Sequence, residues 1–409
     1  MALLQSGDPQ QRYLPVPIHN LLAEREEGNL GGLALERAVK RMRSELVGLS
    51  RDREVKAFEG SSVTCMCVDE VEDRYLLCGY RDGSVSIVDC EDTPKAGKHA
   101  FETVQRLERS QAHRFIVTGC AWYPLDTGLY MTGSFDKTLK VWDANKEANA
   151  HTFALPDKVH CIAMSASARH SHVAAGCGDG TVYLCDLRSG SHHHSLRGHR
   201  GSWVSSAAWR PGDDFALVTG GKDGTLRLWD VRRTKSCLAM LCQEGRPRQP
   251  KRGRGDEDDL SPPIAHSGGV DAVLFTPEGR YLLSSGADCR LREWDPDTCE
   301  LVVVNFGTFP RQGAGRGQLH RVLQPACASN GPIVYHPRVN DVVGCNVETG
   351  ERVLTLRAHL DAVTCVCTKA RGESVFTAGM DHNVLVWQPP RSWHKEEDEA
   401  GEGDGGGDL

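Results

Sequence analysis

An aspartate stands six residues before a tryptophan at four places in this 409-residue chain. A histidine lies 22 to 24 residues before each aspartate, and a threonine or serine lies four residues before it. Because this spacing recurs, the chain is built from a repeated unit rather than around one unique core. The four sets are His113, Thr132, Asp136 and Trp142; His199, Thr219, Asp223 and Trp229; His266, Ser284, Asp288 and Trp294; and His359, Thr377, Asp381 and Trp387.

The residue types in each set can satisfy one another as a hydrogen-bonded relay. The indole N–H can donate to the hydroxyl, the hydroxyl to the imidazole, and the imidazole to the carboxylate. Buried polar groups need such partners, and stranding one costs about 1–3 kcal/mol. A Ser/His/Asp set would also suit a hydrolase, but a nucleophile site occurs once per protein and this set recurs. We therefore interpret the sets as structural and expect no catalytic residue, no cofactor and no metal ion.

The spacing of the unit matches the WD repeat, a four-stranded antiparallel blade of a β-propeller. Two further turn aspartates, Asp82 and Asp179, stand in similar segments but lack the other three partners. Successive turn aspartates are 54, 43, 44, 65 and 93 residues apart. A blade takes about 40–45 residues, so the longest interval hides a degenerate blade at roughly 300–350. The sequence predicts an all-β, seven-bladed WD-repeat β-propeller with an N-terminal helical segment.

Ring closure and the flanking segments follow from strand order. The last blade has no fourth strand after 384–388, and residues 53–58 are predicted to supply it and so cover the exposed sheet edge. The expected domains are a disordered N-terminus at 1–18, a helix-loop-helix segment at 19–50, the propeller at 51–391 with a disordered charged loop at 243–263, and a disordered acidic tail at 392–409.

The segment 34–49 carries a stripe of apolar residues at intervals of three and four, which predicts an amphipathic helix. The closing strand rises toward the turn aspartates, so this helix reaches the opposite face. There the helical segment either covers the propeller or inserts into a groove on a partner. The stripe consists of Leu35, Val39, Met42, Leu46 and Leu49.

Composition argues against several kinds of site. The 16 cysteines include no CxxC pair, which favours reduced, buried thiols over zinc ligands. The run His192–His194 has no cysteine or carboxylate at ligand spacing. No apolar stretch approaches about 18 residues, so we expect no membrane association. The net charge of −7 argues against a general phosphate-binding surface, and we expect no direct sequence-specific binding of nucleic acid.

One short motif points to a partner. Arg232 follows Trp229 by three residues in the sequence WDVRR, at the end of a strand that leads away from the aspartate turn. A WDxR sequence resembles the signature of propellers that dock onto the adaptor of cullin-4 ubiquitin ligases. Arg232 is expected on the face that the N-terminal helices reach.

Longer segments carry a more specific resemblance. Residues 71–89, 122–143 and 226–238 resemble the Cockayne syndrome A family, and the order of complete and incomplete blades extends the likeness over roughly residues 33–390. The resemblance implies a non-catalytic substrate receptor of a cullin-4 RING ubiquitin ligase, acting in transcription-coupled nucleotide excision repair in the nucleus. It implies three partners: the damaged-DNA-binding adaptor, the Cockayne syndrome B ATPase and the RNA polymerase II elongation complex.

The implied role assigns residues to two faces. The alternative is a histone-binding or general scaffold propeller, which would bind a basic histone peptide without the adaptor. Phe135 and Trp203 could also be ordinary core residues. The predicted adaptor-binding residues are Leu35, Val39, Met42, Leu46 and Arg232, and the predicted target-binding residues are Arg81, Phe135, Lys137, Trp203 and Lys222.

Overall fold

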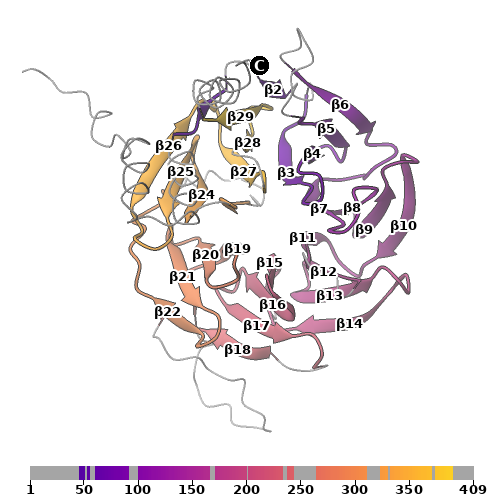
Figure 1. Ribbon diagram of the computed structural model, residues 1–409. Coiled ribbons are helices and arrows are strands. Elements are labelled where there is room, and N and C mark those ends of the chain that lie inside the picture. The colour runs from indigo at the N-terminus through magenta and orange to yellow at the C-terminus, as the bar shows by residue number, and fades with distance from the viewer. Residues whose placement is uncertain are drawn as a thin grey trace, which may run out of the picture.

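The computed structural model forms a ring of β-sheets around one axis (Figure 1). Within the described residues all regular structure is strand, in 29 segments. The predicted helical segment and the charged loop fall almost entirely outside these residues. The predicted N-terminus at 1–18, the acidic tail at 392–409, and Leu35, Val39 and Met42 fall wholly outside them. The structure describes residues 46–50, 53–55, 60–91, 100–165, 171–199, 201–233, 237–243, 264–310, 323–329, 332–370 and 374–389.

The strands form seven blades, and in each blade the strands A, B, C and D pair in chain order from the ring axis outward (Figure 1). Blade 1 contains β3 (Val63–Val68), β4 (Tyr75–Tyr80), β5 (Val85–Asp89) and β6 (Ala100–Leu107). Blade 2 contains β7 (Val117–Trp122), β8 (Leu129–Ser134), β9 (Thr138–Asp143) and β10 (Ala148–Ala154). Blade 3 contains β11 (Val159–Met164), β12 (His172–Cys177), β13 (Thr181–Asp186) and β14 (Ser191–Arg197).

The second half of the ring repeats this order. Blade 4 contains β15 (Val204–Arg210), β16 (Asp213–Gly221), β17 (Leu226–Asp230) and β18 (Cys237–Leu241). Blade 5 contains β19 (Val270–Phe275), β20 (Leu282–Gly286), β21 (Leu291–Asp295) and β22 (Glu300–Val302). Blade 6, the degenerate one, contains β23 (Ala326–Cys327), β24 (Ile333–Arg338), β25 (Asp341–Asn346) and β26 (Arg352–Arg357). Blade 7 contains β27 (Val363–Thr368), β28 (Val375–Gly379) and β29 (Val384–Gln388).

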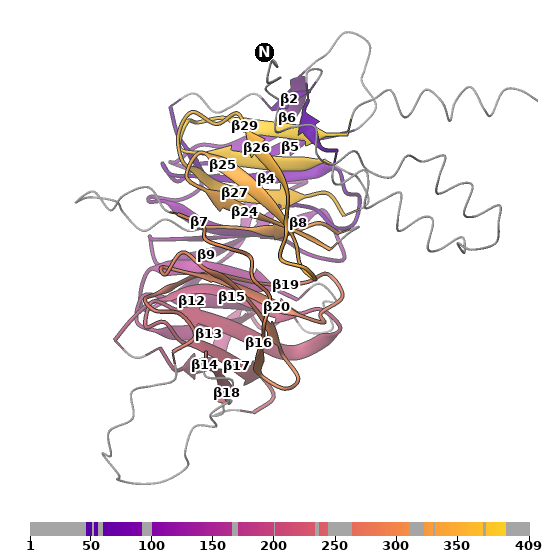
Figure 2. The same cartoon turned by 90° about the vertical axis from the view of Figure 1, so that its left-hand side faces the viewer.

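The chain before blade 1 supplies the outer strand of blade 7. Two short strands, β1 (Gly48–Leu49) and β2 (Glu54–Val55), both pair antiparallel with β29, and β2 also pairs with β6. Figure 2 shows the ring edge-on, from this joint of β29, β2 and β6 to β17 and β18 at the far side.

The closing strand begins earlier than the sequence suggested. The pairing of β2 with β29 confirms that residues within 53–58 supply the outer strand of blade 7. Pairing already starts at Gly48, however, and Leu49, which was predicted to be helical, lies in β1, so these two boundaries were wrong. The uncovered edge of β29 holds residues 48–49 in strand geometry, and this tertiary pairing outweighs the local helical periodicity.

Strand direction defines two faces of the ring. We call the end that carries the B–C turns, with their aspartates, the aspartate face, and the other end the opposite face. Gly48 lies beside Gln388 at the end of β29, and Val55 lies beside Val384 at its start. The chain therefore enters the ring at the opposite face and runs toward the aspartate face.

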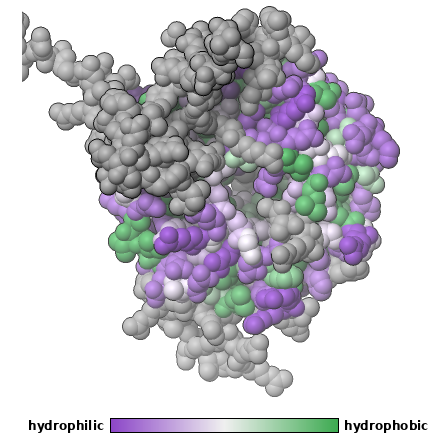
Figure 3. All heavy atoms as spheres, in the orientation of Figure 1, coloured by the Kyte–Doolittle hydropathy of each residue, from purple (hydrophilic) through white to green (hydrophobic). Residues whose placement is uncertain are grey.

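The core is divided into layers between neighbouring blades. One layer joins Met131 and Leu139 of blade 2 to Val159 and Val173 of blade 3, and all four side chains are buried. Layers of this kind bury the apolar side of each sheet against the next blade. On the side seen in Figure 3, the described surface is mostly hydrophilic with scattered apolar residues.

Candidate functional site

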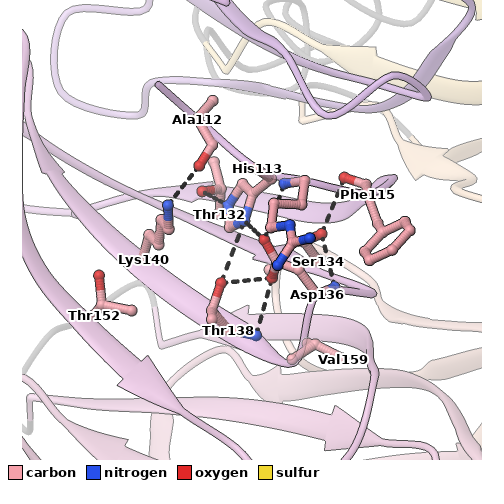
Figure 4. A network of polar contacts seen from close by, with 12 residues as sticks. Ala112, His113, Phe115, Thr132, Ser134, Asp136, Thr138, Lys140, Thr152 and Val159 are labelled. Atoms are coloured by element: carbon pink, nitrogen blue, oxygen red, sulfur yellow. Dashed lines mark hydrogen bonds and ion pairs between the residues drawn. The ribbon is translucent and has the colours of Figure 1, made fainter. Parts of the chain in front are cut away.

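The relay in blade 2 links a loop, two strands and a turn, and Figure 4 shows three of its members, His113, Thr132 and Asp136. Trp142 Nε1 on β9 donates a hydrogen bond of 2.8 Å to Thr132 Oγ1 on β8. His113, in the loop before β7, places Nε2 2.7 Å from that hydroxyl and Nδ1 2.8 Å from Asp136 Oδ2 in the B–C turn. The relay therefore ties the D–A loop of the blade to its aspartate turn.

The other three sets make the same bonds in the same order. Each tryptophan Nε1 donates to the hydroxyl at 2.8 Å, each histidine Nε2 lies 2.7–2.8 Å from that hydroxyl, and each Nδ1 lies 2.9–3.2 Å from the carboxylate. The four hydroxyls are completely inaccessible to solvent. A substrate cannot reach them, so their geometry supports a structural role and not nucleophilic catalysis.

The relay shifts the pKa values of its titratable members. Burial lowers the pKa of His113 below its usual value, although Asp136 acts in the other direction. Burial works to raise the pKa of Asp136, but its interactions with His113 and Thr138 outweigh burial and lower the pKa to about 2. The same balance lowers the pKa of Asp223 and Asp381. At neutral pH these carboxylates are ionised acceptors, as the relay requires.

Arg232 lies on the opposite face, in the C–D turn of blade 4. Its guanidinium makes two hydrogen bonds of 2.9 Å with the Asp230 carboxylate and lies over the Phe215 ring, 4.7 Å from the ring centroid. The side chain is still 61% exposed. A guanidinium held in this way keeps one orientation while its outer edge stays available to a partner. The contact with Phe215 has no signature in the sequence, because it joins the C–D turn to the start of β16.

The predicted target-binding residues all lie on the aspartate face, in turns or at strand starts. Arg81 and Lys137 are exposed, and Lys137 lies 3.7 Å from Asp157. Lys222 forms an ion pair with Asp271, the second residue of β19 in the next blade. Phe135 is half-buried.

The structure brings Phe135 and Trp203 together through a residue that the sequence did not single out. The ring of His160 lies between them, with centroid distances of 4.8 Å to Phe135 and 5.7 Å to Trp203. Arg81 does not belong to this row, because it lies in the B–C turn of blade 1. Assembly of the row depends on three successive blades, which local sequence patterns do not show.

The described residues contain no group of three or more His, Cys, Asp or Glu side chains able to hold a metal ion. All sixteen cysteines are free thiols, and burial raises the pKa of Cys161, for example, to about 12. In the same part of the chain, no helix has the length and apolar character needed to cross a membrane.

Comparison with protein families identifies the repeats. The family described as WD domain, G-beta repeat matches residues 103–143, 190–230, 261–295 and 350–388. Each of these segments contains one complete relay and the A, B and C strands of one blade. Three of them, all but 261–295, also include most or all of the D strand of the preceding blade. The A, B and C strands of blades 1, 3 and 6, which lack the relay, lie outside the matched segments.

Curated relatives extend the similarity beyond single repeats. WD repeat-containing protein ATCSA-1 of Arabidopsis thaliana is 31% identical over 432 residues, covering 90% of this chain and 94% of the relative. Guanine nucleotide-binding protein subunit beta of Oryza sativa subsp. indica is 27% identical, over 61% of each chain. Radiation-sensitive protein 28 of Saccharomyces cerevisiae is 26% identical, over 49% of this chain and 42% of the relative.

Proposed function

This chain belongs to the WD-repeat protein family, and from that premise we propose that it is the substrate-recognition subunit of a cullin-4 RING ubiquitin ligase. Its role would be in transcription-coupled nucleotide excision repair in the nucleus. The proposed partners are the damaged-DNA-binding adaptor on the opposite face, and the Cockayne syndrome B ATPase and stalled RNA polymerase II on the aspartate face. The chain itself would carry no catalytic residue.

The observation that carries this proposal is the similarity to ATCSA-1 over 90% of this chain. The match to the general repeat family contains one complete relay in each segment. A similarity that covers 90% of the chain must also include blades that lack the relay. It agrees with the resemblance of residues 71–89, 122–143 and 226–238 to the Cockayne syndrome A family. Propellers of this family generally act as scaffolds or receptors.

The geometry offers a mechanism by proximity. The N-terminal segment enters the ring at the opposite face, which also carries the oriented guanidinium of Arg232. An adaptor bound there would leave the aspartate face open to a target. Holding a target lysine near a ligase raises its effective concentration without any chemistry in this chain.

The test is loss of the adaptor after mutation of the opposite face. We expect the double variant Arg232→Ala, Met42→Asp to lose co-purification of the adaptor from nuclear extract. The matched control is Arg188→Ala, because Arg188 has the same C–D turn position in blade 3, in the sequence CDLR. Unchanged recovery of the adaptor by the double variant would contradict the proposal. Tight binding of a basic histone peptide without any adaptor would instead favour a histone-binding propeller.

A further inference from the structure

A second repeated device joins the blades at the inner edge of the aspartate face. In six blades the A strand begins with a buried valine, and the next residue forms a β-bulge against strand B. The six valines are Val63, Val117, Val159, Val204, Val270 and Val363.

In four of these blades the bulged residue is a threonine or serine that bridges two blades. Thr118 Oγ1, for example, lies 3.2 Å from the Gly133 carbonyl oxygen of its own blade and 2.8 Å from the Val159 carbonyl oxygen of the next. The hydroxyls of Thr64, Ser205 and Thr364 make the equivalent pairs of contacts. We call this contact the hydroxyl bridge.

Two blades depart from the hydroxyl bridge. Blade 3 carries His160 at the bulged position, and blade 5 carries Asp271. They lie on either side of blade 4. Recognition sites are expected where a repeat is broken, because the repeated contacts already account for the scaffold.

His160 forms the centre of an aromatic row on the aspartate face. Its ring lies nearly parallel to Trp203, with an interplanar angle of 18°, and tilted against Phe135 at 59°. The three residues come from blades 2, 3 and 4, whose inner strands β7, β11 and β15 are neighbours in the ring (Figure 1). We call Phe135, His160 and Trp203 the aromatic row.

Positive charge borders the aromatic row. Lys158 is exposed, and its Nζ lies 5.7 Å from the Phe135 ring centroid. Lys137 follows Phe135 by two residues and is 52% exposed. Among the described residues, the acidic neighbour Asp157 makes one ion pair, a long contact of 3.7 Å between its Oδ1 and Lys137 Nζ. Phe115 is 55% exposed, and its backbone carbonyl accepts a hydrogen bond from Ser134, the residue before Phe135.

We propose that the aromatic row and its lysines bind an acidic peptide segment that carries one aromatic or aliphatic anchor. The anchor packs on the exposed edges of Phe135 and Trp203, and the carboxylates flanking it pair with Lys137 and Lys158. This proposal rests on the proposed function only in taking the aspartate face as the target-binding face. It adds the chemical class of the target segment.

The experiment measures binding of defined probes to the purified full chain. The probes are fluorescein-labelled short peptides with one tryptophan flanked by glutamates, and the comparison peptides carry lysines for glutamates or alanine for tryptophan. We expect the glutamate–tryptophan peptide to bind, with affinity that falls as salt rises. Absence of binding, or equal binding of the lysine peptide, would overturn the proposal.

The decisive variant is His160→Thr, which installs the residue that Thr118 provides in blade 2. Because threonine can form the hydroxyl bridge, we expect the melting temperature not to fall, while peptide affinity drops about tenfold or more through loss of the central ring. Retained affinity in the folded variant would overturn the proposal. Lys158→Glu, a surface change, should weaken binding about tenfold through charge reversal and tests the proposal independently of folding.

Two variants of the opposite face serve as controls. Lys146→Glu reverses a 79% exposed lysine in a C–D turn of blade 2, and Leu125→Ala removes a 63% exposed apolar side chain in the A–B loop of the same blade. Both should leave peptide binding unchanged, and a loss equal to that of Lys158→Glu would overturn the assignment to the aspartate face. Adaptor recovery is measured separately, so peptide binding without the adaptor would count against the proposed ligase role alone.

Discussion

Two kinds of blade stabilise the same B–C turn with different sets of hydrogen bonds. Four blades have complete relays, and two keep only the turn aspartate. In blade 2, Asp136 accepts hydrogen bonds from the Thr138 amide and hydroxyl and also ends the relay at His113. In blade 1, Asp82 accepts the amide and hydroxyl of Ser84. The turn aspartate therefore has two separable roles, and capping the B–C turn is the one that all these blades need.

The positions of the missing partners show why they are lost together. In blade 1, Cys78 and Val88 take the hydroxyl and tryptophan positions, and both are buried. In blade 3, Ala175 and Cys185 do so, and Tyr183 donates a hydrogen bond of 2.8 Å to Asp179 from another position. Replacing every member by an apolar residue strands no polar group, whereas replacing one member does.

The largest effect is expected when one relay hydroxyl is removed without changing the volume of the side chain. In Thr132→Val, both the Trp142 indole N–H and the His113 Nε2 lose their buried partner, so we expect a loss of about 2–4 kcal/mol of unfolding free energy. The measurement is urea-induced unfolding followed by circular dichroism.

Blade 1 provides the control for this variant. Cys78 stands at the hydroxyl position without relay partners, so Cys78→Ala removes only a small apolar group and should cost about 1 kcal/mol. An equal loss in the two variants would show that packing, and not the relay, accounts for the effect.

The next largest effect is expected at acidic pH, where the relay blades should lose more of their contribution to the unfolding free energy than the blades without a relay. The folded-state pKa of Asp136 is about 2, below its value of about 4 in an unfolded chain, so its contribution is complete above pH 4 and disappears as pH falls toward 2. The pKa of His113 is also lowered in the fold. Its contribution is therefore complete above an unfolded value of about 6.5 and declines below it. Both shifts make the protein less stable on acidification.

The variant Asp136→Asn removes the aspartate's titration and leaves that of His113. We expect the fall in unfolding free energy between about pH 4 and pH 2 to become smaller by about 1–2 kcal/mol in this variant. The matched control is Asp179→Asn in blade 3, which has no histidine relay. Parallel profiles for both variants would argue against the relay as the source.

Repetition determines how much of the molecule the sequence could predict. The turn aspartates and their intervals predicted the ring and located the blade that contains β24 and β25. The position of Gly48 in the closing strand was not predictable, because it depends on the exposed edge of β29, far away in the sequence. The aromatic row was not predictable either. His160 stands where four other blades have a threonine or serine at the bulged position of the A strand, and this pattern becomes visible only when the bulges of separate blades are compared.

The smallest expected effect concerns the residue after each turn aspartate, which has a positive φ in both kinds of blade. Glycine occupies this position as Gly83 and Gly180, whereas blade 5 uses Cys289 at φ 59°. A non-glycine residue with a positive φ destabilises the fold by about 1–2 kcal/mol. Glycine removes this strain, but its greater freedom in the unfolded chain offsets about 0.5–1 kcal/mol of the gain. Cys289→Gly should therefore stabilise the protein by up to about 1 kcal/mol, seen as a rise in melting temperature of about 1–2 °C. Cys289→Ala keeps the strained Cβ and should give no rise, so an equal gain in both variants would locate the effect in the thiol instead of the backbone.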